Sequence, residues 1–350
     1  MPDYSDYYAE HLEKCAEKID RYEATLPEFV ARYLNSRMKL QESTKAEYIA
    51  DLNIFFNWMH QKKRELREKE VEDITLEDMA KLTADDIQSY MSYLSAASVS
   101  EYKNNRNSIS RKLIPLNGLF KYYLLREKLT MNPVELVERP REPKTKGQAW
   151  LNTDDIAKIL NVIEYNNGTY SEHTRKMRSH RTQRDYTMIR LMAETGIRIS
   201  ECIGLDIPHI NFKEKRITVT RKGGHPDLIY ISEELLTLLK DYINGYRAEQ
   251  KVKPEAENAL FISNRGSRMT ARNLQIMLKS YGEAAEIYDK KITPHKLRKA
   301  YGTALYKKSG GDIEMVKDVL GHESITTTTR YIDNEGDKKR ATGMINYNDI

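Results

Sequence analysis

The sequence predicts a mainly α-helical protein with one small antiparallel β-sheet, folded as two domains. Its length of 350 residues fits two domains of ordinary size, each long enough to bury a core of its own. Apolar residues recur at helical spacing along most of the chain, which indicates amphipathic helices. One short stretch alternates apolar and polar residues instead, which indicates a β-hairpin in the second half.

Residues 1–137 are expected to form a bundle of about five helices. The stretch 6–37 is helical in pattern, with a break near Pro27. Thr44 and Glu47 have the spacing of a capping box, which predicts a helix beginning there. The apolar face of that helix consists of Ile49, Leu52, Phe55, Phe56 and Met59.

The remaining helices of this part have weaker boundaries. Residues 62–73 are a charged run, expected to be a solvated loop or a helix end. Thr83 can cap the helix that follows it. A last helical pattern covers 113–124, where Pro115 marks either the first turn or a kink.

Residues 138–147 read as an extended linker, because they combine two prolines and a glycine with cationic residues and nothing apolar enough to pack. Residues 148–350 form the second domain. Asn152 or Thr153 is expected to cap its first helix, and residues 168–184 are expected to be a basic loop.

The β-hairpin is predicted within this second domain, after a helical pattern at 185–194. Ile217 and Val219 alternate with polar residues and precede a Lys222-Gly223-Gly224 turn. Apolar residues at Leu228, Tyr230 and Ile231 follow the turn. From Glu233 onward the pattern is mostly helical again.

Composition argues against several classes of protein. No stretch approaches the roughly 18 apolar residues of a membrane-spanning helix, and the polar N-terminus lacks the pattern of a secretory signal. Cys15 and Cys202 are too few for a disulfide framework or a cysteine-rich zinc site, which makes the cytoplasm the expected compartment. We expect no cofactor and no metal, because the chain has neither a nucleotide-binding fingerprint nor an acidic cluster spaced for two metals.

Cationic residues gather in two stretches that could neutralise a polyanion such as DNA, in a chain of net charge +5. Residues 103–128 contain Glu127 as their only acid, and the linker is the second stretch. A solvated helix face is the alternative for the first stretch. The expected DNA contacts are Lys103, Arg106, Arg111, Lys112, Lys121, Arg141, Lys144 and Lys146.

Five short segments of the second domain carry residues suited to chemistry on a phosphodiester. Each is weak evidence alone, but their order and spacing together are very specific. They are the 194–201 segment with Arg198, the hairpin residues Arg221-Lys222, the His295-x-x-Arg298 pair after Pro294, Leu320-Gly321-His322, and Tyr331 nine residues after His322.

This ordered set resembles the tyrosine recombinase (phage integrase) family. The family pattern is an arginine after Gly-x, a hairpin lysine, His-x-x-Arg, Leu-Gly-His and a tyrosine nucleophile. Residues 1–137, down to Asn132-Pro133, resemble the core-binding domain of the family, and residues 148–350 resemble its catalytic domain. The resemblance implies a site-specific recombinase whose two domains enclose double-stranded DNA as a clamp.

The chemistry of a phosphodiester agrees with this resemblance. Its non-bridging oxygens gain negative charge during displacement, and positioned cations stabilise that charge. A planar guanidinium can bind two of these oxygens, so Arg198 and Arg298 are the expected phosphate ligands. Each follows a local break in the chain, at Gly196 or Pro294. Glu201, three residues after Arg198, is expected to orient that arginine.

The resemblance implies roles for four more residues. Lys222 would be the general acid that protonates the leaving 5′ oxygen. His295 and His322 would hydrogen-bond the phosphate oxygens and assist proton transfer. Tyr331 would be the nucleophile, and its phosphoryl ester would conserve bond energy, so that religation needs no cofactor.

One segment departs from the family pattern. The family often has further basic residues after the hairpin lysine, whereas this chain reads His225-Pro226-Asp227. The departure weakens the expectation that the far arm of the hairpin touches phosphate. It also leaves Arg221 open as an alternative to Lys222.

The resemblance further implies a homotetramer on two DNA sites. Tyrosines of two subunits would cut one strand of each duplex, and the free 5′ hydroxyls would form a Holliday junction that the other two subunits resolve. The purpose is either integration and excision of a mobile element or resolution of chromosome dimers, with accessory DNA-binding proteins left open. Residues 332–350 would either dock on a neighbouring subunit or form a disordered tail.

Two alternatives stay open. A type IB topoisomerase or a telomere resolvase would use the same chemistry with another outcome. The core-binding resemblance and the Leu-Gly-His segment favour recombination over both. A non-catalytic DNA-binding protein on the same fold is the second alternative, and the complete set of catalytic residue types argues against it.

Overall fold

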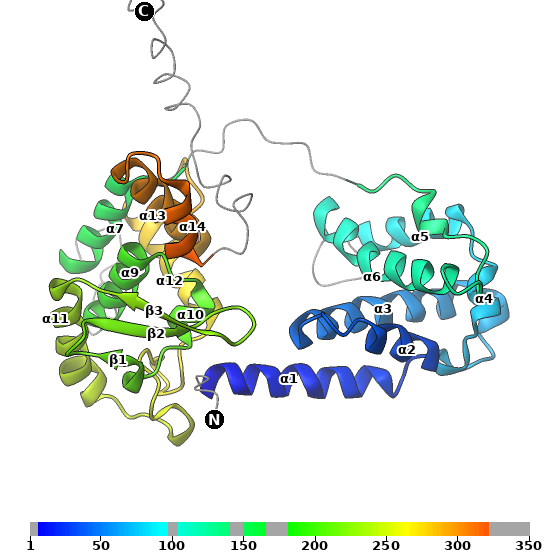
Figure 1. Cartoon of the computed structure of the whole chain (residues 1–350), viewed down its shortest axis with the longest axis horizontal. Coiled ribbons are helices and arrows are strands. Elements are labelled where there is room, and N and C mark those ends of the chain that lie inside the picture. Colours follow the sequence, from blue (N-terminus) through cyan, green and yellow to red (C-terminus); the bar gives the residue numbers. More distant parts are fainter. Residues whose placement is uncertain (1–5, 97–103, 141–149, 166–180, 322–350) are drawn as a thin grey trace, which may run out of the picture. The chain divides into compact units, whose positions relative to one another are not determined.

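The computed structural model describes residues 6–96, 104–140, 150–165 and 181–321 (Figure 1). The chain separates into two compact units. We call residues 9–146 the helical unit, and the other unit, built mainly of residues 147–350, the mixed unit. The predicted fold class is confirmed, because the chain is mainly helical and a three-stranded antiparallel sheet lies in the mixed unit.

The first part of the chain contains six α-helices within its described residues, one more than expected. They are α1 (Asp6–Glu23), α2 (Glu28–Ser36), α3 (Glu42–Lys62), α4 (Leu76–Ala80), α5 (Ala84–Ser95) and α6 (Arg106–Leu124). The predicted break at Pro27 separates α1 from α2. Short 3-10 turns lie at Arg64–Leu66, Val71–Asp73 and Pro133–Glu135.

One predicted cap of this unit is confirmed and one is wrong. The Thr83 side chain accepts a bond from the Asp86 N–H, so it begins α5 as expected. Helix α3 begins before Thr44, because the Thr44 and Lys45 N–H groups both bond the carbonyl of Gln41 at 2.9 and 3.0 Å. Thr44 therefore already lies within the first turn, and its hydroxyl does not cap the helix.

Helix α6 also begins earlier than the apolar pattern indicated. Asn105 caps it through the Ser108 N–H, and Pro115 lies buried in the helix interior, not in its first turn. The first turn of α6 is polar, so an apolar stripe could not mark it. Proline supplies no N–H to the helix, so one carbonyl of the preceding turn lacks its usual partner.

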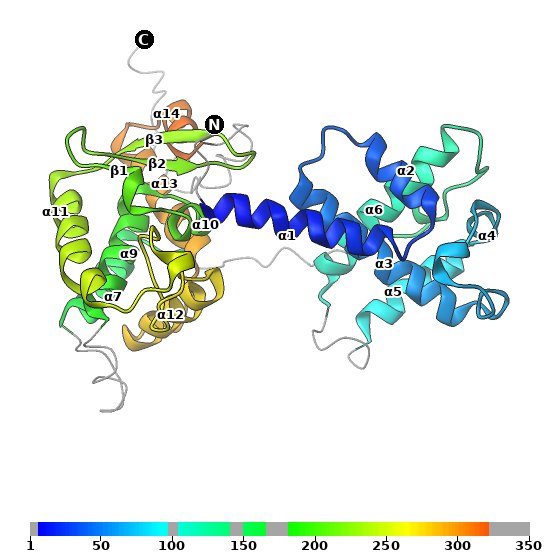
Figure 2. The same cartoon turned by 90° about the horizontal axis from the view of Figure 1, so that it is seen from below.

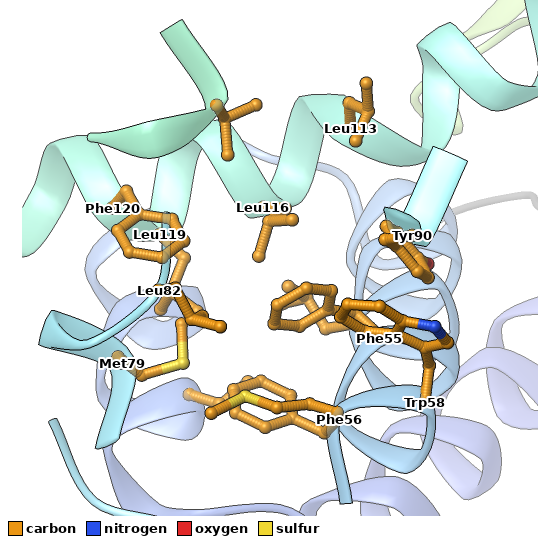
Figure 3. Packing of buried hydrophobic residues seen from close by; sticks show 14 of the residues in the cluster. Phe55, Phe56, Trp58, Met79, Leu82, Tyr90, Leu113, Leu116, Leu119 and Phe120 are labelled. Carbon is orange, nitrogen blue, oxygen red and sulfur yellow. The ribbon is translucent and has the colours of Figure 1, made fainter. Parts of the chain in front are cut away.

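The core of the helical unit is rich in aromatic side chains (Figure 3). Phe55, Phe56 and Trp58 of α3 lie in this cluster together with Leu116 and Phe120 of α6. The ring centroids of Phe55 and Phe56 lie 5.5 Å apart, in an edge-to-face arrangement. Burial of one large apolar side chain contributes about 1.5–3 kcal/mol, so this cluster is the main source of stability.

In its described residues, the mixed unit combines the sheet with α-helices. These are α7 (Thr153–Tyr165), α9 (Thr182–Thr195), α10 (Ile199–Ile203), α11 (Glu233–Tyr242), α12 (Ala271–Ala284), α13 (Pro294–Lys308) and α14 (Ile313–Leu320). The strands are β1 (Ile210–Asn211), β2 (Arg216–Thr220) and β3 (Pro226–Tyr230). Short turns lie at Ile207–His209, Ile243–Arg247 and Pro254–Ala256.

The predicted hairpin is confirmed. The strand order is β1-β2-β3, and Val219 pairs with Asp227 across the hairpin. Ile217 and Val219 of β2 are buried in one core, and α9 packs against α7, α11 and α13. Figure 2 shows the sheet along one side of this unit.

The first helix of the mixed unit begins at a reciprocal cap. The Asn152 side chain accepts from the Asp155 N–H at 2.8 Å, and the Asp155 carboxylate accepts from the Asn152 N–H at 2.9 Å. Asn152 is therefore the cap and Thr153 the first helical residue. Linker residues 141–147 and loop residues 168–180 lie outside the described part of the chain.

Candidate active site

A left-handed glycine positions the first arginine of the site. Helix α9 ends at Gly196, with φ of 62°, where the Gly196 N–H bonds the Met192 carbonyl at 3.0 Å. A Cβ at Gly196 would lie 2.4 Å from Cδ1 of Tyr301, so no other residue fits. The sharp exit from α9 places Arg198 directly before α10.

The buried carboxylate of Glu201 holds this arginine by two bonds. Its Oε2 accepts the backbone N–H of Arg198, and its Oε1 accepts Arg198 Nη1, both at 2.7 Å. Glu201 is 4% exposed, whereas the Arg198 side chain is 33% exposed. Arg198 therefore presents part of its guanidinium to solvent while its backbone and one nitrogen are fixed.

The second arginine lies deeper. Pro294 is the first residue of α13, and Arg298 lies one turn further along that helix. Arg298 is 2% exposed, and its Nη1 donates to the Gly196 carbonyl at 2.6 Å. Its Nη2 donates to the Leu320 carbonyl. The two arginines are thus tied to the same glycine exit from α9.

His295 lies one turn before Arg298 on α13. Partial burial of its ring lowers the pKa of His295 below 6.5, and the charges of Arg298, Lys299 and Arg198 lower it further. The neutral imidazole is therefore favoured near neutral pH. A neutral ring can accept one hydrogen bond and donate another, which suits proton transfer.

The C-terminal end of α14 binds both arginines. This helix ends at Gly321, with φ of 60°. The Gly321 carbonyl accepts Arg198 Nη2 at 3.2 Å, next to the Leu320 carbonyl that accepts Arg298. Carbonyls at a helix C-terminus carry partial negative charge, which favours this contact with cations. His322 follows directly, but His322 and Tyr331 lie outside the described residues.

The hairpin presents Lys222 to solvent. Two left-handed glycines, Gly223 and Gly224, form the turn with φ of 93° and 84°. The Arg221 N–H bonds the His225 carbonyl at 2.8 Å, and the Gly224 N–H bonds the Arg221 carbonyl at 3.0 Å. The Lys222 backbone is therefore fixed on both sides, while its side chain extends from the exposed tip.

Arg221 has a different environment from Lys222. Its Nη1 donates to Glu201 Oε2 at 2.9 Å, and its Nε donates to Asp227 Oδ2 at 2.8 Å. The side chain is 10% exposed. Lys222 is therefore the hairpin cation that can approach a substrate. The sequence analysis did not predict the contacts of Arg221. The signal that could have revealed them was Asp227, an acid at a position where the family often has a basic residue.

Trp150 is a second residue that the sequence did not single out. Lys299 Nζ of α13 lies 3.1 Å from the centroid of the Trp150 ring, close enough for a cation–π interaction. The Trp150 side chain is 45% exposed. It contacts the helix that carries His295 and Arg298, from the start of the mixed unit.

The expected DNA contacts that lie within the described residues divide into an exposed pair and a pair that binds carboxylates. Arg106 and Lys121 of α6 are exposed. Arg111 forms an ion pair with Glu47, and Lys112 bonds Asp51 at 2.7 Å with only 14% of its side chain exposed. A phosphate contact from Lys112 would have to break that buried pair. Lys103, Arg141, Lys144 and Lys146 lie outside the described residues.

Two features are absent from the described part of the chain. No group of three histidine, cysteine, aspartate or glutamate side chains there could hold a metal ion. No helix in the same residues is long and apolar enough to cross a membrane.

Comparisons with known proteins agree with this geometry. The chain is 26% identical over 318 residues to "Tyrosine recombinase XerC" of Caldanaerobacter subterraneus subsp. tengcongensis, covering 89% of this chain and 83% of the relative. It is 29% identical to "Tyrosine recombinase XerS" of Streptococcus mutans serotype c, covering 90% of this chain and 94% of the relative.

Solved structures share the fold. An integrase of transposon Tn1549 in complex with circular intermediate DNA has a TM-score of 0.63 at 18% identity, covering 90% of this chain and 97% of that one. XerH bound to its difH substrate after cleavage has a TM-score of 0.60 at 20% identity, covering 86% and 79%. Residues 149–337, more than half of the sequence, match the profile of the phage integrase family. This chain belongs to the phage integrase family.

Proposed function

We propose that this tyrosine site-specific recombinase cuts and rejoins DNA through a covalent bond to Tyr331. The observation that carries the proposal is the cluster at the end of α14 that joins the partly exposed Arg198 to the buried Glu201 and Arg298. In the sequence, His322 directly follows Gly321, and Tyr331 is nine residues further on. Relatives named tyrosine recombinases support site-specific recombination as the outcome.

The proposed cleavage is an in-line displacement at phosphorus. The Tyr331 hydroxyl gives its proton to neutral His295, the proposed acceptor, as its oxygen attacks phosphorus. The bond from phosphorus to the 5′ oxygen breaks, and a 3′-phosphotyrosyl link forms. Lys222 Nζ gives its proton to the leaving 5′ oxygen, which departs as a hydroxyl. Arg198 and Arg298 stabilise the charge that develops on the non-bridging oxygens. Religation is the reverse step, with a 5′ hydroxyl as the nucleophile.

The two histidines assist at the phosphate. His295, whose pKa is lowered by burial, is neutral at pH 7 and can accept a hydrogen bond from the attacking hydroxyl or donate one to a phosphate oxygen. His322 follows the carbonyl that holds Arg198 and is proposed as the second such partner. Removal of either histidine should slow cleavage without abolishing DNA binding.

Double-stranded DNA is the proposed partner. Exposed Arg106 and Lys121 lie on α6 of the helical unit, and neutralising phosphates with such residues releases counterions, so affinity should fall as salt rises. The proposed contacts also include Lys103 and three linker residues, Arg141, Lys144 and Lys146. We further propose that the protein acts as a homotetramer on two DNA sites, with or without accessory proteins. The proposed compartment is the cytoplasm.

The biological outcome has two candidates. Relatives named XerC and XerS favour resolution of chromosome dimers. The likeness to a transposon integrase is a likeness of fold, and it keeps integration and excision of a mobile element in the proposal. Recombination is measured between two copies of the mapped site, placed either in one plasmid or on two plasmids. Comparing these two arrangements distinguishes the two candidate outcomes.

Covalent trapping tests the chemistry. Wild type and Tyr331→Phe are incubated with nicked fragments from around the gene of the protein, and denaturing gels score protein attached to DNA. Tyr288→Phe is the matched control, because Tyr288 is a 73% exposed tyrosine of the same unit. An adduct with wild type and the control, but not with Tyr331→Phe, is expected.

Other outcomes point elsewhere. An adduct that survives Tyr331→Phe would assign the nucleophile to another tyrosine. Tight specific binding without any adduct would favour a non-catalytic DNA-binding protein. Relaxation of supercoiled plasmids regardless of their sequence would favour a topoisomerase.

A further inference from the structure

One buried side chain joins three elements of the candidate site. Arg221 directly follows strand β2, and its guanidinium binds Glu201 of α10 at 2.9 Å and Asp227 of β3 at 2.8 Å. Its Nη2 donates to the Val319 carbonyl of α14 at 3.3 Å. Every contact leads to an element that carries or fixes a proposed catalytic residue.

We infer that Arg221 is a positioning residue, which holds the Lys222 hairpin against the end of α14 and so sets where the proton donor meets the phosphate. This inference rests on the proposed function. Arg221 does not act on the substrate itself, because its guanidinium is directed to Glu201, Asp227 and the Val319 carbonyl, and the side chain is 10% exposed.

The charges around Arg221 support a fixed position. A buried guanidinium without partners would be strongly unfavourable, and removing one partner of a buried pair leaves the other uncompensated. Here two carboxylates and one carbonyl accept from three different nitrogens, a fork geometry that lysine lacks. Asp227 lies on the strand after the turn, so the pair also ties the two arms of the hairpin beside that turn.

The packing beside Gly321 extends the argument. A Cβ on Gly321 would lie 2.9 Å from Arg221 Nε and 3.1 Å from its Cζ. The arginine therefore packs directly against the turn whose carbonyl accepts Arg198. A shift of Arg221 changes the distance between the hairpin and the phosphate-binding arginine.

A substrate with a sulfur in place of the leaving 5′ oxygen separates proton donation from the other steps. With ordinary DNA, the leaving oxygen takes a proton from Lys222 as its bond to phosphorus breaks. With sulfur, the bond from phosphorus to sulfur breaks and the thiolate leaves without a proton, because thiols are far more acidic than alcohols. A defect confined to positioning Lys222 is therefore absent with the sulfur substrate.

The experiment measures single-turnover cleavage of both substrates at the site that trapping maps. Arg221→Lys keeps the charge and removes the fork, and Asp227→Asn is a milder second variant. Lys222→Ala calibrates the loss of the proton donor. Arg268→Lys is the matched control, because Arg268 is another partly buried arginine that binds a carboxylate, Asp206 at 2.6 Å, and the carbonyls of Ile203 and Leu205.

The expected result is specific to the proton donor. Arg221→Lys should cleave ordinary DNA roughly 10- to 100-fold more slowly, as for a catalytic group displaced by about 1 Å. It should cleave the sulfur substrate at the wild-type rate, as Lys222→Ala should. Asp227→Asn should show the same pattern with a smaller loss, and Arg268→Lys should cleave both substrates like wild type.

Two results would overturn the inference while leaving the proposed function intact. One is wild-type cleavage of ordinary DNA by both Arg221→Lys and Asp227→Asn. The other is an equal loss on both substrates, which would assign Arg221 to overall stability or to Arg198. Wild type that forms no adduct with either substrate would instead overturn the proposed function, and the inference with it.

Discussion

The two units of this molecule differ in which charged side chains they bury. The helical unit is built around one cluster of aromatic and aliphatic side chains. The mixed unit divides its apolar residues between two larger clusters. All four buried arginines of the described residues belong to the mixed unit: Arg184, Arg221, Arg247 and Arg298.

This difference separates stability from chemistry. Burial of an arginine is unfavourable unless carboxylates and carbonyls compensate its charge. A unit that buries four arginines therefore either needs cations in fixed positions or has a lower stability. Arg298 and Arg221 lie in the candidate active site, where a fixed position is needed. Among its described residues the helical unit buries two carboxylates, Asp51 and Asp78, each paired with a lysine, but no arginine, and its core is mainly apolar.

The largest expected effect is on the stability of the helical unit. Phe56→Ala should lower its free energy of unfolding by about 3–5 kcal/mol, because Phe56 is fully buried between α3 and its neighbours. Leu125→Ala is the matched control, since Leu125 is 73% exposed and should change stability by less than about 0.5 kcal/mol. Urea unfolding of both variants measures this, and equal midpoints would contradict the aromatic core as the main source of stability.

The second effect contrasts two arginines of the site. Arg198→Ala should slow DNA cleavage by about 100- to 1,000-fold with little change in melting temperature, because its side chain is 33% exposed. Arg298→Ala should lose cleavage and melting temperature together, since the buried Arg298 bonds the Gly196 and Leu320 carbonyls. Single-turnover cleavage and thermal unfolding compare them. Equal loss of stability in both variants would remove the distinction between the exposed and the buried arginine that we propose as phosphate ligands.

A third, smaller effect concerns two threonines of the helical unit. Thr83→Ala should lower stability by about 1 kcal/mol, because the Thr83 hydroxyl accepts from the Asp86 N–H. Thr44→Ala should be neutral or slightly stabilising, because Thr44 lies inside the first turn of α3, where alanine is the better helix former. Chemical unfolding resolves the two, and a comparable loss in Thr44→Ala would restore it as a cap.

The smallest effect is the pH dependence that His295 adds. Its pKa is lowered in the folded state, so the unfolded chain binds the proton more readily. The contribution to stability is complete above the ordinary histidine pKa and is lost as pH falls through the lowered one. Thermal unfolding between pH 7 and 5 should therefore show a steeper loss for wild type than for His295→Gln. Parallel curves would exclude this contribution.

Local sequence patterns predicted the elements well where one interaction dominates. The hairpin was predicted from the alternation at Ile217 and Val219 and from the Gly223-Gly224 pair, and both glycines have φ above zero in the structure. Thr83 could be recognised as a cap because its partner Asp86 lies three residues away. The same spacing misled the prediction for Thr44. Any threonine with an acid three residues further on has capping-box spacing, whichever residue begins the helix.

The contacts of the site could be predicted only in part. The spacing from Arg198 to Glu201 lies within one turn, so their bond could be expected from the sequence. The carbonyls of Gly196 and Leu320 bind Arg298 across 102 and 22 residues, and no local pattern contains such contacts. Arg221 was left open because a hairpin arginine and a hairpin lysine look alike until their burial is known.

The chain has two tryptophans, Trp58 in the core of the helical unit and Trp150 at the start of the mixed unit. Trp58 is 1% exposed and Trp150 is 45% exposed beneath Lys299. Intrinsic fluorescence therefore carries two separable signals, a blue-shifted emission from Trp58 and a red-shifted emission from Trp150. With Trp58→Phe and Trp150→Phe as single-reporter proteins, each unit can be followed optically, without an attached dye, as the protein binds DNA or unfolds.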